Sequence, residues 1–260
     1  MADKLPGLME ALRSRRALGL WQKTAAKGGN MSSDQLADLA PVARQVARHA
    51  QGLAEAADRR LLGPRLGQDG IARPPQCDWA WRATPWATAM HPTAIAGAEG
   101  GTQLGEGIRL FHDCPLSEIT LRQSRTTDPQ AKAPFVLTLD ALGFQGSFLS
   151  LAMDLPPEGG GTLQRSHIVI LSTHLRMERQ AEIFARLNIR QGPNVEQLVS
   201  ELLPGERPDS PVSAEFDLGF HDIKPAKLEN AWIDLIFEKP AMNMVRIEDV
   251  TVTRRPRADI

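Results

Sequence analysis

Apolar residues recur at every second position from about residue 101 to the C-terminus, and this period restricts the fold more than any other feature of the chain. In the clearest run, from Val212 to Phe220, apolar residues alternate with Glu215 and Asp217. Such alternation is typical of a β-strand that buries one face. The sequence predicts comparable strands over residues 108–111, 119–123, 135–141, 148–153, 169–177, 183–189 and 233–237.

These strands follow one another at short spacing, with Gly and Pro in the connections and no regular alternation with helices. The pattern therefore predicts a mainly β fold, an antiparallel jelly-roll-like β-sandwich. In the last strand the apolar positions change parity between Ile247 and Val250, which predicts a β-bulge at Glu248 and Asp249.

One segment inside the sandwich region has a different period. Residues 194–202 place apolar side chains three and four positions apart, which predicts a short helix there. Its apolar positions are Val195, Leu198, Val199 and Leu202.

The N-terminal third is predicted to be helical. One helix is expected over residues 1–27, ended by the run Gly28-Gly29-Asn30, and a second begins at Ser32, where Ser32-x-x-Gln35 resembles a capping box. The second helix carries a narrow apolar seam of alternating three- and four-residue spacing, suited to a partner helix. The seam residues are Leu36, Leu39, Val46 and Leu53.

Three regions follow from these patterns. Residues 1–62 form a helical N-terminal arm, residues 63–100 a linker and sandwich-edge segment, and residues 101–260 the β-sandwich. The arm is expected to tether or oligomerise the sandwich, so self-association or a protein partner is predicted.

Charge and composition exclude some partners and favour others. The chain has 30 basic and 31 acidic residues, a balance that argues against nucleic acid and other general polyanions. Residues 4–27 are locally basic and loosely amphipathic, which leaves two interpretations: peripheral contact with an anionic membrane, or a helix packed on the sandwich or a disordered tail with its charges solvated. No apolar run approaches the roughly 18–20 residues that span a bilayer. The two cysteines, Cys77 and Cys114, are too few for a disulfide framework, so a cytoplasmic protein is expected.

Two stretches near the C-terminus carry a resemblance to known modules. Residues 231–237 read Ala-Trp-Ile-Asp-Leu-Ile-Phe, and residues 245–252 read Val-Arg-Ile-Glu-Asp-Val-Thr-Val. This ending resembles the last two strands of a carbohydrate-binding-module-type jelly roll. The resemblance implies the sandwich fold and, by extension, a polysaccharide-binding module acting at a cell envelope or capsule.

The whole chain also resembles an uncharacterised alphaproteobacterial protein family. The matching phrases are Leu-Phe-His-Asp-Cys at residues 110–114, Phe-Ala-Arg-Leu-Asn at 184–188 and Trp-Ile-Asp-Leu at 232–235. That family has no assigned function, so the resemblance supports the fold rather than a role.

Sugar binding requires exposed aromatic faces, and the chain has no Tyr. Within the sandwich region only Trp79, Trp81, Trp86 and Trp232 are available, because most Phe residues fall at predicted core positions. Trp79, Trp81 and Trp86 are the candidate ligand contacts, with His112 as a further one. The alternative for the tryptophans is that they seal the edge of the sandwich.

Other chemistry has weaker support. His112 and Cys114 share a strand face but lack partners in a recognised zinc pattern, so no transition metal is favoured. Asp249 is a weak candidate for a structural calcium ion of the kind several jelly-roll modules carry. Gly159-Gly160-Gly161 is not followed by Lys-Ser/Thr and predicts a loop rather than a phosphate site.

The sequence thus favours a non-catalytic binding or assembly module without a cofactor. A polysaccharide-binding module is the first alternative. A hydrolase on a β-sandwich scaffold is the second, because paired carboxylates cannot be recognised from spacing along the chain.

Overall fold

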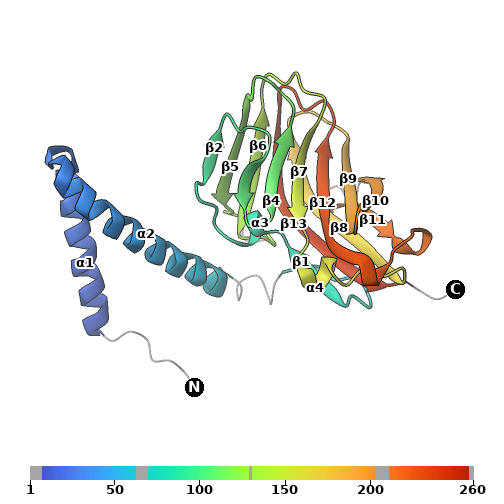
Figure 1. The fold of residues 1–260 in the computed structure, drawn as a ribbon, viewed down its shortest axis with the longest axis horizontal. Helices are drawn as coiled ribbons and strands as arrows, with labels where there is room; N and C mark the ends of the chain where they lie inside the picture. Colours follow the sequence, from blue (N-terminus) through green and yellow to red (C-terminus); the bar gives the residue numbers. More distant parts are fainter. Residues whose placement is uncertain (1–7, 63–69, 129–130, 203–210, 258–260) are drawn as a thin grey trace. The chain divides into compact units, whose positions relative to one another are not determined.

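A computed structural model describes residues 8–62, 70–128, 131–202 and 211–257. The chain divides into two compact units, Met1–Ala56 and Ala57–Ile260. The first is helical and the second contains the β-sandwich (Figure 1).

The arm consists of two helices joined by a tight turn: α1 (Leu8–Lys27), η1 (Gly28–Asn30) and α2 (Ser33–Leu62). The predicted capping box is confirmed. The Ser32 amide donates to Gln35 Oε1 at 3.1 Å, and the Gln35 amide donates to Ser32 Oγ at 3.3 Å. Pro41 lies inside α2.

The predicted antiparallel β-sandwich is present. One sheet, sheet A, has the order β11-β8-β13-β6-β5-β2, with β1 also paired to β13; the other, sheet B, has the order β10-β9-β12-β7-β4-β3. Sheet A contains β1 (Trp79–Arg82), β2 (Ala94–Ala96), β5 (Ile119–Arg125), β6 (Phe135–Ala141), β8 (His167–Met177), β11 (Val212–Asp217) and β13 (Asn243–Pro256). Sheet B contains β3 (Thr102–Gly105), β4 (Ile108–His112), β7 (Leu149–Asp154), β9 (Ile183–Gln191), β10 (Asn194–Glu201) and β12 (Leu228–Phe237).

Short helices occupy some connections: α3 (Thr84–Ala87), α4 (Pro157–Gly160), η3 (Leu218–Phe220) and η4 (Pro225–Lys227). From β6 to β13 the chain crosses from one sheet to the other at each connection except the β9–β10 hairpin. Repeated crossing of this kind is typical of jelly-roll-like sandwiches.

The core lies between the two sheets and is built from the alternate positions that the period-two pattern marked. Leu139 in sheet A and Leu151, Leu187 and Ile233 in sheet B are fully buried. Because successive side chains in a strand point to opposite faces, the residues between them lie on the outer faces. The outer face of sheet B therefore carries the residues that alternate with these buried ones, among them Trp232 and Asp234.

The predicted bulge is also confirmed. The pairing of β13 with β8 shifts register between Ile247 and Asp249, leaving Glu248 as the extra residue. On the other side of β13, β6 pairs only as far as Ile247, and β1 takes over from Thr251 onward. The segment predicted as linker and sandwich edge thus contributes β1 and β2 to sheet A.

The helix predicted over residues 194–202 is wrong, because β10 occupies these positions. Leu198 and Leu202 are buried, whereas Val195 and Val199 are exposed on the other face. Residues four positions apart share a face in a strand and also in a helix, so the spacing of Leu198 and Leu202 fits both structures. The two-residue turn Gly192-Pro193, with Gly192 at φ +60°, closes a β-hairpin with β9 and decides between them.

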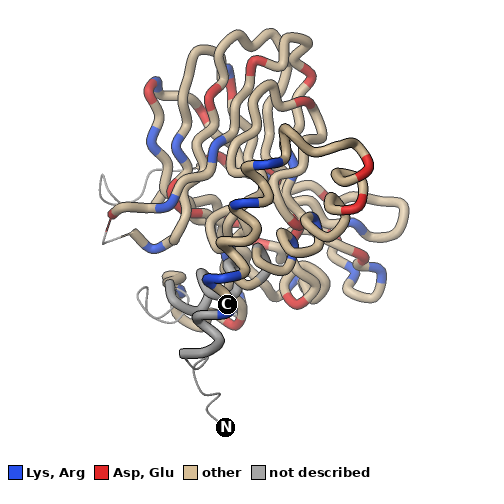
Figure 2. The backbone as a smooth tube through the Cα atoms, turned by 90° about the vertical axis from the view of Figure 1, so that its left-hand side faces the viewer, with Lys and Arg blue, Asp and Glu red and all other residues tan. Residues whose placement is uncertain are grey.

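Charges are mixed over the surface. In the view of Figure 2, basic and acidic positions are interspersed along the sandwich. Among the described residues, no helix has both the length and the hydrophobicity to cross a bilayer.

Candidate functional site

The outer face of sheet B carries a groove of about 650 Å³ across β4, β7, β12 and β9. This volume lies within the range of small-molecule sites. Its floor follows β7, where the outward side chains Ser150 and Ala152 are small and almost buried. In the sheet register, Ala152 lies between Arg109 of β4 and Asp234 of β12. Small side chains flanked by large ones make the hollow.

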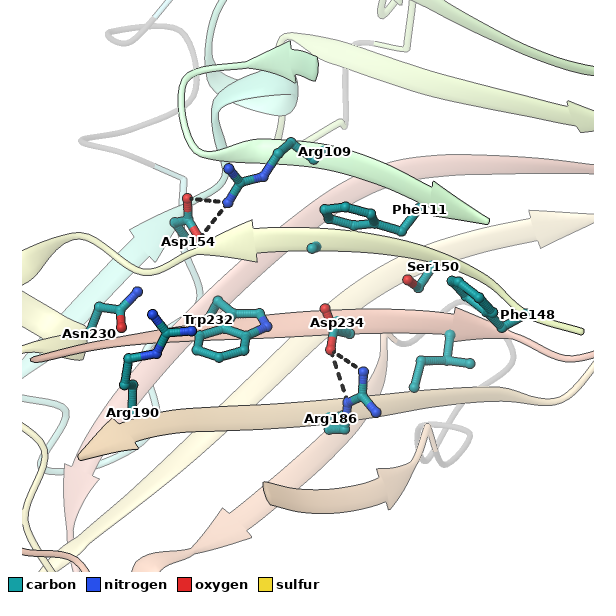
Figure 3. A pocket seen from close by; sticks show the side chains of 12 residues that line it. Arg109, Phe111, Phe148, Ser150, Asp154, Arg186, Arg190, Asn230, Trp232 and Asp234 are labelled. Atoms are coloured by element: carbon teal, nitrogen blue, oxygen red, sulfur yellow. Dashed lines mark hydrogen bonds and ion pairs between the residues drawn. The ribbon is translucent and has the colours of Figure 1, made fainter. Parts of the chain in front are cut away.

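Aromatic side chains form the walls (Figure 3). Phe111 projects from β4 and is 37% exposed, and Phe148, just before β7, is 42% exposed. Trp232 of β12 is half-buried and lies toward the other end of the groove, opposite Asp154 of β7. The guanidinium of Arg190, on β9, lies over the Trp232 ring, 5.7 Å from the ring centre. Three apolar ring faces thus lie beside a floor of small side chains.

A buried carboxylate fixes one of the groove's arginines. Both Nε and Nη2 of Arg186 donate to Asp234 Oδ2, at 2.9 and 2.8 Å, and Asn188 Nδ2 donates to the same oxygen at 2.9 Å. Asn188 in turn accepts from Gln197 at 3.0 Å. The Asp234 side chain is only 6% exposed, whereas that of Arg186 is 35% exposed. The carboxylate therefore holds the guanidinium in place at the groove surface.

A second ion pair lies at the opposite wall. Arg109 Nη2 donates to both oxygens of Asp154, at 3.3 and 3.1 Å, and both side chains remain partly exposed. Gly107, in the turn before β4, has φ +69°, and a Cβ there would press on Asp154. The turn therefore needs glycine in order to approach this pair.

Hydrogen bonds to Asp113 fix the backbone that carries Phe148. Asp113 accepts from the Ser147 amide at 2.7 Å, the Ser147 hydroxyl at 2.6 Å and the Phe148 amide at 3.3 Å. The Ser147 hydroxyl, followed by these amides, holds the pKa of Asp113 below its usual value despite the opposing effect of desolvation. The ionised carboxylate thus anchors the backbone that presents the ring.

The tryptophans put forward from the sequence lie elsewhere. Trp79 and Trp81, on β1, pair with Arg254 and Val252 of β13 and pack partly buried against the core. A Cβ on Gly159 would overlap the Trp79 ring, so the glycines of α4 allow the ring to lie directly on the backbone. This is the edge-sealing arrangement that the sequence offered as the alternative.

Trp86 is fully buried in α3, and its indole N–H donates to the Ile247 carbonyl at 2.8 Å. This carbonyl lies just before the bulge, where β6 has ended and β1 has not begun. Gln123 fastens the same segment, accepting from the Met90 amide and donating to the carbonyls of Pro85 and Thr88. The Trp86 indole thus supplies a hydrogen-bond donor where the strand pairing of β13 is interrupted, and its side chain is not exposed to solvent.

His112 faces the core side of β4 and is 8% exposed. Its Nδ1 accepts from the Cys114 amide at 3.1 Å, so Nε2 carries the proton and donates to the Ala98 carbonyl at 2.8 Å. Both ring nitrogens are occupied by backbone, which leaves none for a ligand or a metal.

Asp249, the calcium candidate, is held by a guanidinium. Arg82 Nε and Nη2 donate to its two carboxylate oxygens at 2.8 and 3.0 Å, and both side chains are 8% exposed. Within the described part of the chain, no three His, Cys, Asp or Glu residues gather as a metal site would require. The pair stabilises the bulge instead.

The seam of α2 is open to solvent. Leu36, Val46 and Leu53 are 44%, 39% and 72% exposed, and Leu39 is half-buried. Within the arm as described, these apolar side chains lack a covering partner.

Sequence reasoning considered Trp232 but passed over Phe111 and Phe148. The signal for Phe111 was available in the alternation of residues 108–112, where Ile108, Leu110 and His112 share the inward face and Phe111 must point outward. The arginines gave no comparable signal, because Arg109 of β4 comes near Arg186 and Arg190 of β9 only when β7 and β12 are placed between these strands in sheet B.

The fold is an antiparallel two-sheet β-sandwich with an open groove on the outer face of sheet B. The chain belongs to the family of unknown function DUF6478, whose family model matches residues 1–260. Among curated proteins, none matches the sequence.

Several solved structures share the arrangement distantly. The bacteriophage CBA120 tailspike protein 4 enzymatically active domain has a TM-score of 0.40 and 8% identity over 62% of this chain and 21% of its own. The CBM22-1 xylan-binding domain of Paenibacillus barcinonensis Xyn10C has a TM-score of 0.37 and 9% identity over 64% and 94%. The family 11 carbohydrate-binding module of Clostridium thermocellum Lic26A-Cel5E has a TM-score of 0.38 and 8% identity over 64% and 98%. At these values the likeness concerns the two-sheet arrangement and not a ligand.

Proposed function

We propose that the sandwich is a non-catalytic binding module and that its ligand is an oligosaccharide lying in the sheet B groove. The observation that carries this proposal is the combination of a floor of small side chains with Phe111, Phe148 and Trp232 beside it. Aromatic rings offer apolar faces to the C–H faces of pyranose rings.

The polar lining supports the same ligand class. Arg109, Arg186 and Asn230 present N–H donors, and Asp154 and Ser150 present acceptors, all within the groove. Sugar hydroxyls both donate and accept, so they require such a mixed set. The four strands, at about 4.8 Å spacing, make the groove roughly 14 Å across, which accommodates a short oligosaccharide.

The carboxylates favour binding over hydrolysis. Asp234 is buried beneath Arg186 and Asn188, and Asp154 is paired with Arg109. A glycosidase needs one carboxyl that delivers a proton to the leaving oxygen and a second that reaches the anomeric carbon. Asp234 instead positions Arg186, which donates two hydrogen bonds to it.

The test is a glycan array that includes neutral and acidic oligosaccharides, probed with the full chain. The wild-type protein is expected to bind at least one glycan class, and Trp232→Ala or Phe111→Ala to reduce that binding by roughly 10-fold or more. Phe220→Ala is the matched control, because Phe220 is 78% exposed and lies outside the groove. Absence of binding to every glycan overturns the proposal.

We further propose that the arm self-associates through the α2 seam. Leu39, Val46 and Leu53 are seven residues apart, and Leu36 precedes Leu39 by three, which is the spacing of a helix–helix seam. A second copy of α2 offers the same apolar stripe and so covers both helices with one contact.

Size-exclusion chromatography with light scattering tests this part. The full chain is expected to be an oligomer, and Val46→Glu with Leu53→Glu to give monomers with the sandwich still folded. Arg48→Glu, which lies on α2 outside the seam, is the control. A full-length chain that is monomeric at every concentration contradicts it.

Peripheral membrane contact through residues 4–27 and a cytoplasmic location stay predictions. Flotation with anionic liposomes at two salt concentrations tests the membrane contact.

A further inference from the structure

The charges of the groove are unbalanced at one end. Three guanidiniums, those of Arg109, Arg186 and Arg190, line the groove together with two carboxylates. Asp154 pairs with Arg109 and Asp234 pairs with Arg186. Among the described residues, no carboxylate pairs with Arg190. The groove therefore carries one uncompensated positive charge, and its position is fixed by β9.

Arg190 is placed to use this charge on a ligand. Its guanidinium carbon lies over the Trp232 ring, 5.7 Å from the ring centre (Figure 3). The side chain is exposed, and Asn230 lies directly opposite it in the register of β9 and β12. A planar fork and a carboxamide thus stand together beside an aromatic wall.

We propose that the oligosaccharide is acidic and that Arg190 binds the carboxylate of a uronic acid residue whose ring packs beside Trp232. The planar guanidinium fork matches a carboxylate with two parallel hydrogen bonds, which a hydroxymethyl group cannot reproduce. Asn230 supplies a further N–H donor at the same end. Arg186 and Arg109 are each paired with a carboxylate of the groove, so they bind sugar hydroxyls or shape the groove rather than select an acidic ligand.

This inference rests on the proposed glycan-binding function, and the experiment separates the two. Calorimetric titrations compare an oligogalacturonate with the same oligosaccharide after reduction of its carboxyl groups. The acidic oligosaccharide is expected to bind roughly 10- to 100-fold more tightly, as a charge-assisted hydrogen-bond pair implies, and its binding to weaken with added salt.

Variants locate the effect. Arg190→Gln is expected to lower the affinity for the acidic oligosaccharide more than that for the reduced one, so that the difference between the two affinities is lost. Arg122→Gln, on sheet A and with a 57% exposed side chain, is the charge-matched control and is expected to change neither. Circular dichroism of each variant checks folding.

The outcomes are distinct. Equal binding of the acidic and reduced oligosaccharides leaves the glycan-binding function intact and overturns the acidic assignment. A preference for the acidic form that survives Arg190→Gln overturns the role of Arg190. Binding of neither oligosaccharide, together with a silent array, overturns the proposed function itself.

Discussion

The sandwich region holds tryptophans in two contrasting places. Trp79, Trp81 and Trp86 follow one another in a segment that is built into sheet A, where they complete a strand ladder and cover the core. Trp232 projects from the open face of sheet B beside an arginine and a row of small side chains. The first group clusters along the sequence, and the second site clusters only in space.

The difference explains why a run of tryptophans is a poor guide to a binding surface. The β13 bulge ends pairing with β6 at Ile247, and the chain must satisfy the carbonyls beyond it. Trp86 donates to the Ile247 carbonyl, and the Ala83 amide donates to that of Val250. Trp86 is therefore required by the fold, whereas Trp232 lies half-buried on the outer face of sheet B.

The largest expected effect is at Trp86. Trp86→Ala removes a fully buried side chain and leaves the Ile247 carbonyl without its donor, so it should lower the free energy of unfolding by about 3–5 kcal/mol. Chemical denaturation followed by circular dichroism measures this. A loss below about 1 kcal/mol would contradict the structural role assigned to this tryptophan.

The next effect concerns the glycine beneath Trp79. Gly159→Ala places a methyl group where the Trp79 ring lies and should cost about 1–3 kcal/mol through overpacking. Gly105→Ala is the control, because its added methyl group meets only Thr84 at ordinary contact distance. Equal stability of the two variants in thermal unfolding would show that Trp79 does not seal this edge.

Much of the fold could be predicted from the sequence, because alternation reports directly which side of a strand is buried. The same parity rule located the bulge at Glu248. It failed at residues 194–202, where Leu198 and Leu202, four apart, satisfy both periods and only the Gly192-Pro193 turn distinguishes them. A longer run of alternating positions, such as 169–177, leaves no such ambiguity.

The candidate site was less accessible to sequence reasoning. Its floor consists of Ser150 and Ala152, which are unremarkable in a sequence and become a hollow only between β4 and β12. The ion pair of Arg186 with Asp234 joins residues 48 positions apart. Register between strands determines these neighbours, and the register depends on the whole sheet rather than on any one segment.

Trp232→Ala is expected to break the other half of the comparison. The side chain is half-buried on an outer face, so its removal should change the free energy of unfolding by less than about 1 kcal/mol while reducing glycan binding by roughly 10-fold or more. Denaturation and glycan binding measured on the same preparation test this. A loss of stability as large as that of Trp86→Ala would place Trp232 among the structural tryptophans.

The smallest expected effect is a pH dependence from two histidines on β8, an interior strand of sheet A. Burial, with a contribution from Lys132, lowers the pKa of His174, which lies opposite Asp249 at the bulge, and burial likewise lowers the pKa of His167. The unfolded chain then binds protons more readily than the folded one, so stability is fully present above about pH 6.5 and falls as the pH drops from there toward the lower folded pKa values. His174→Gln should reduce this slope, and adding His167→Gln should reduce it further, in urea denaturation between pH 7.5 and about pH 5. Because both side chains are only partly buried, solvent screening keeps the change small. An unchanged slope in the double variant would show that neither histidine is coupled to folding. The residues lining the groove include no histidine, so neither substitution is expected to change ligand binding.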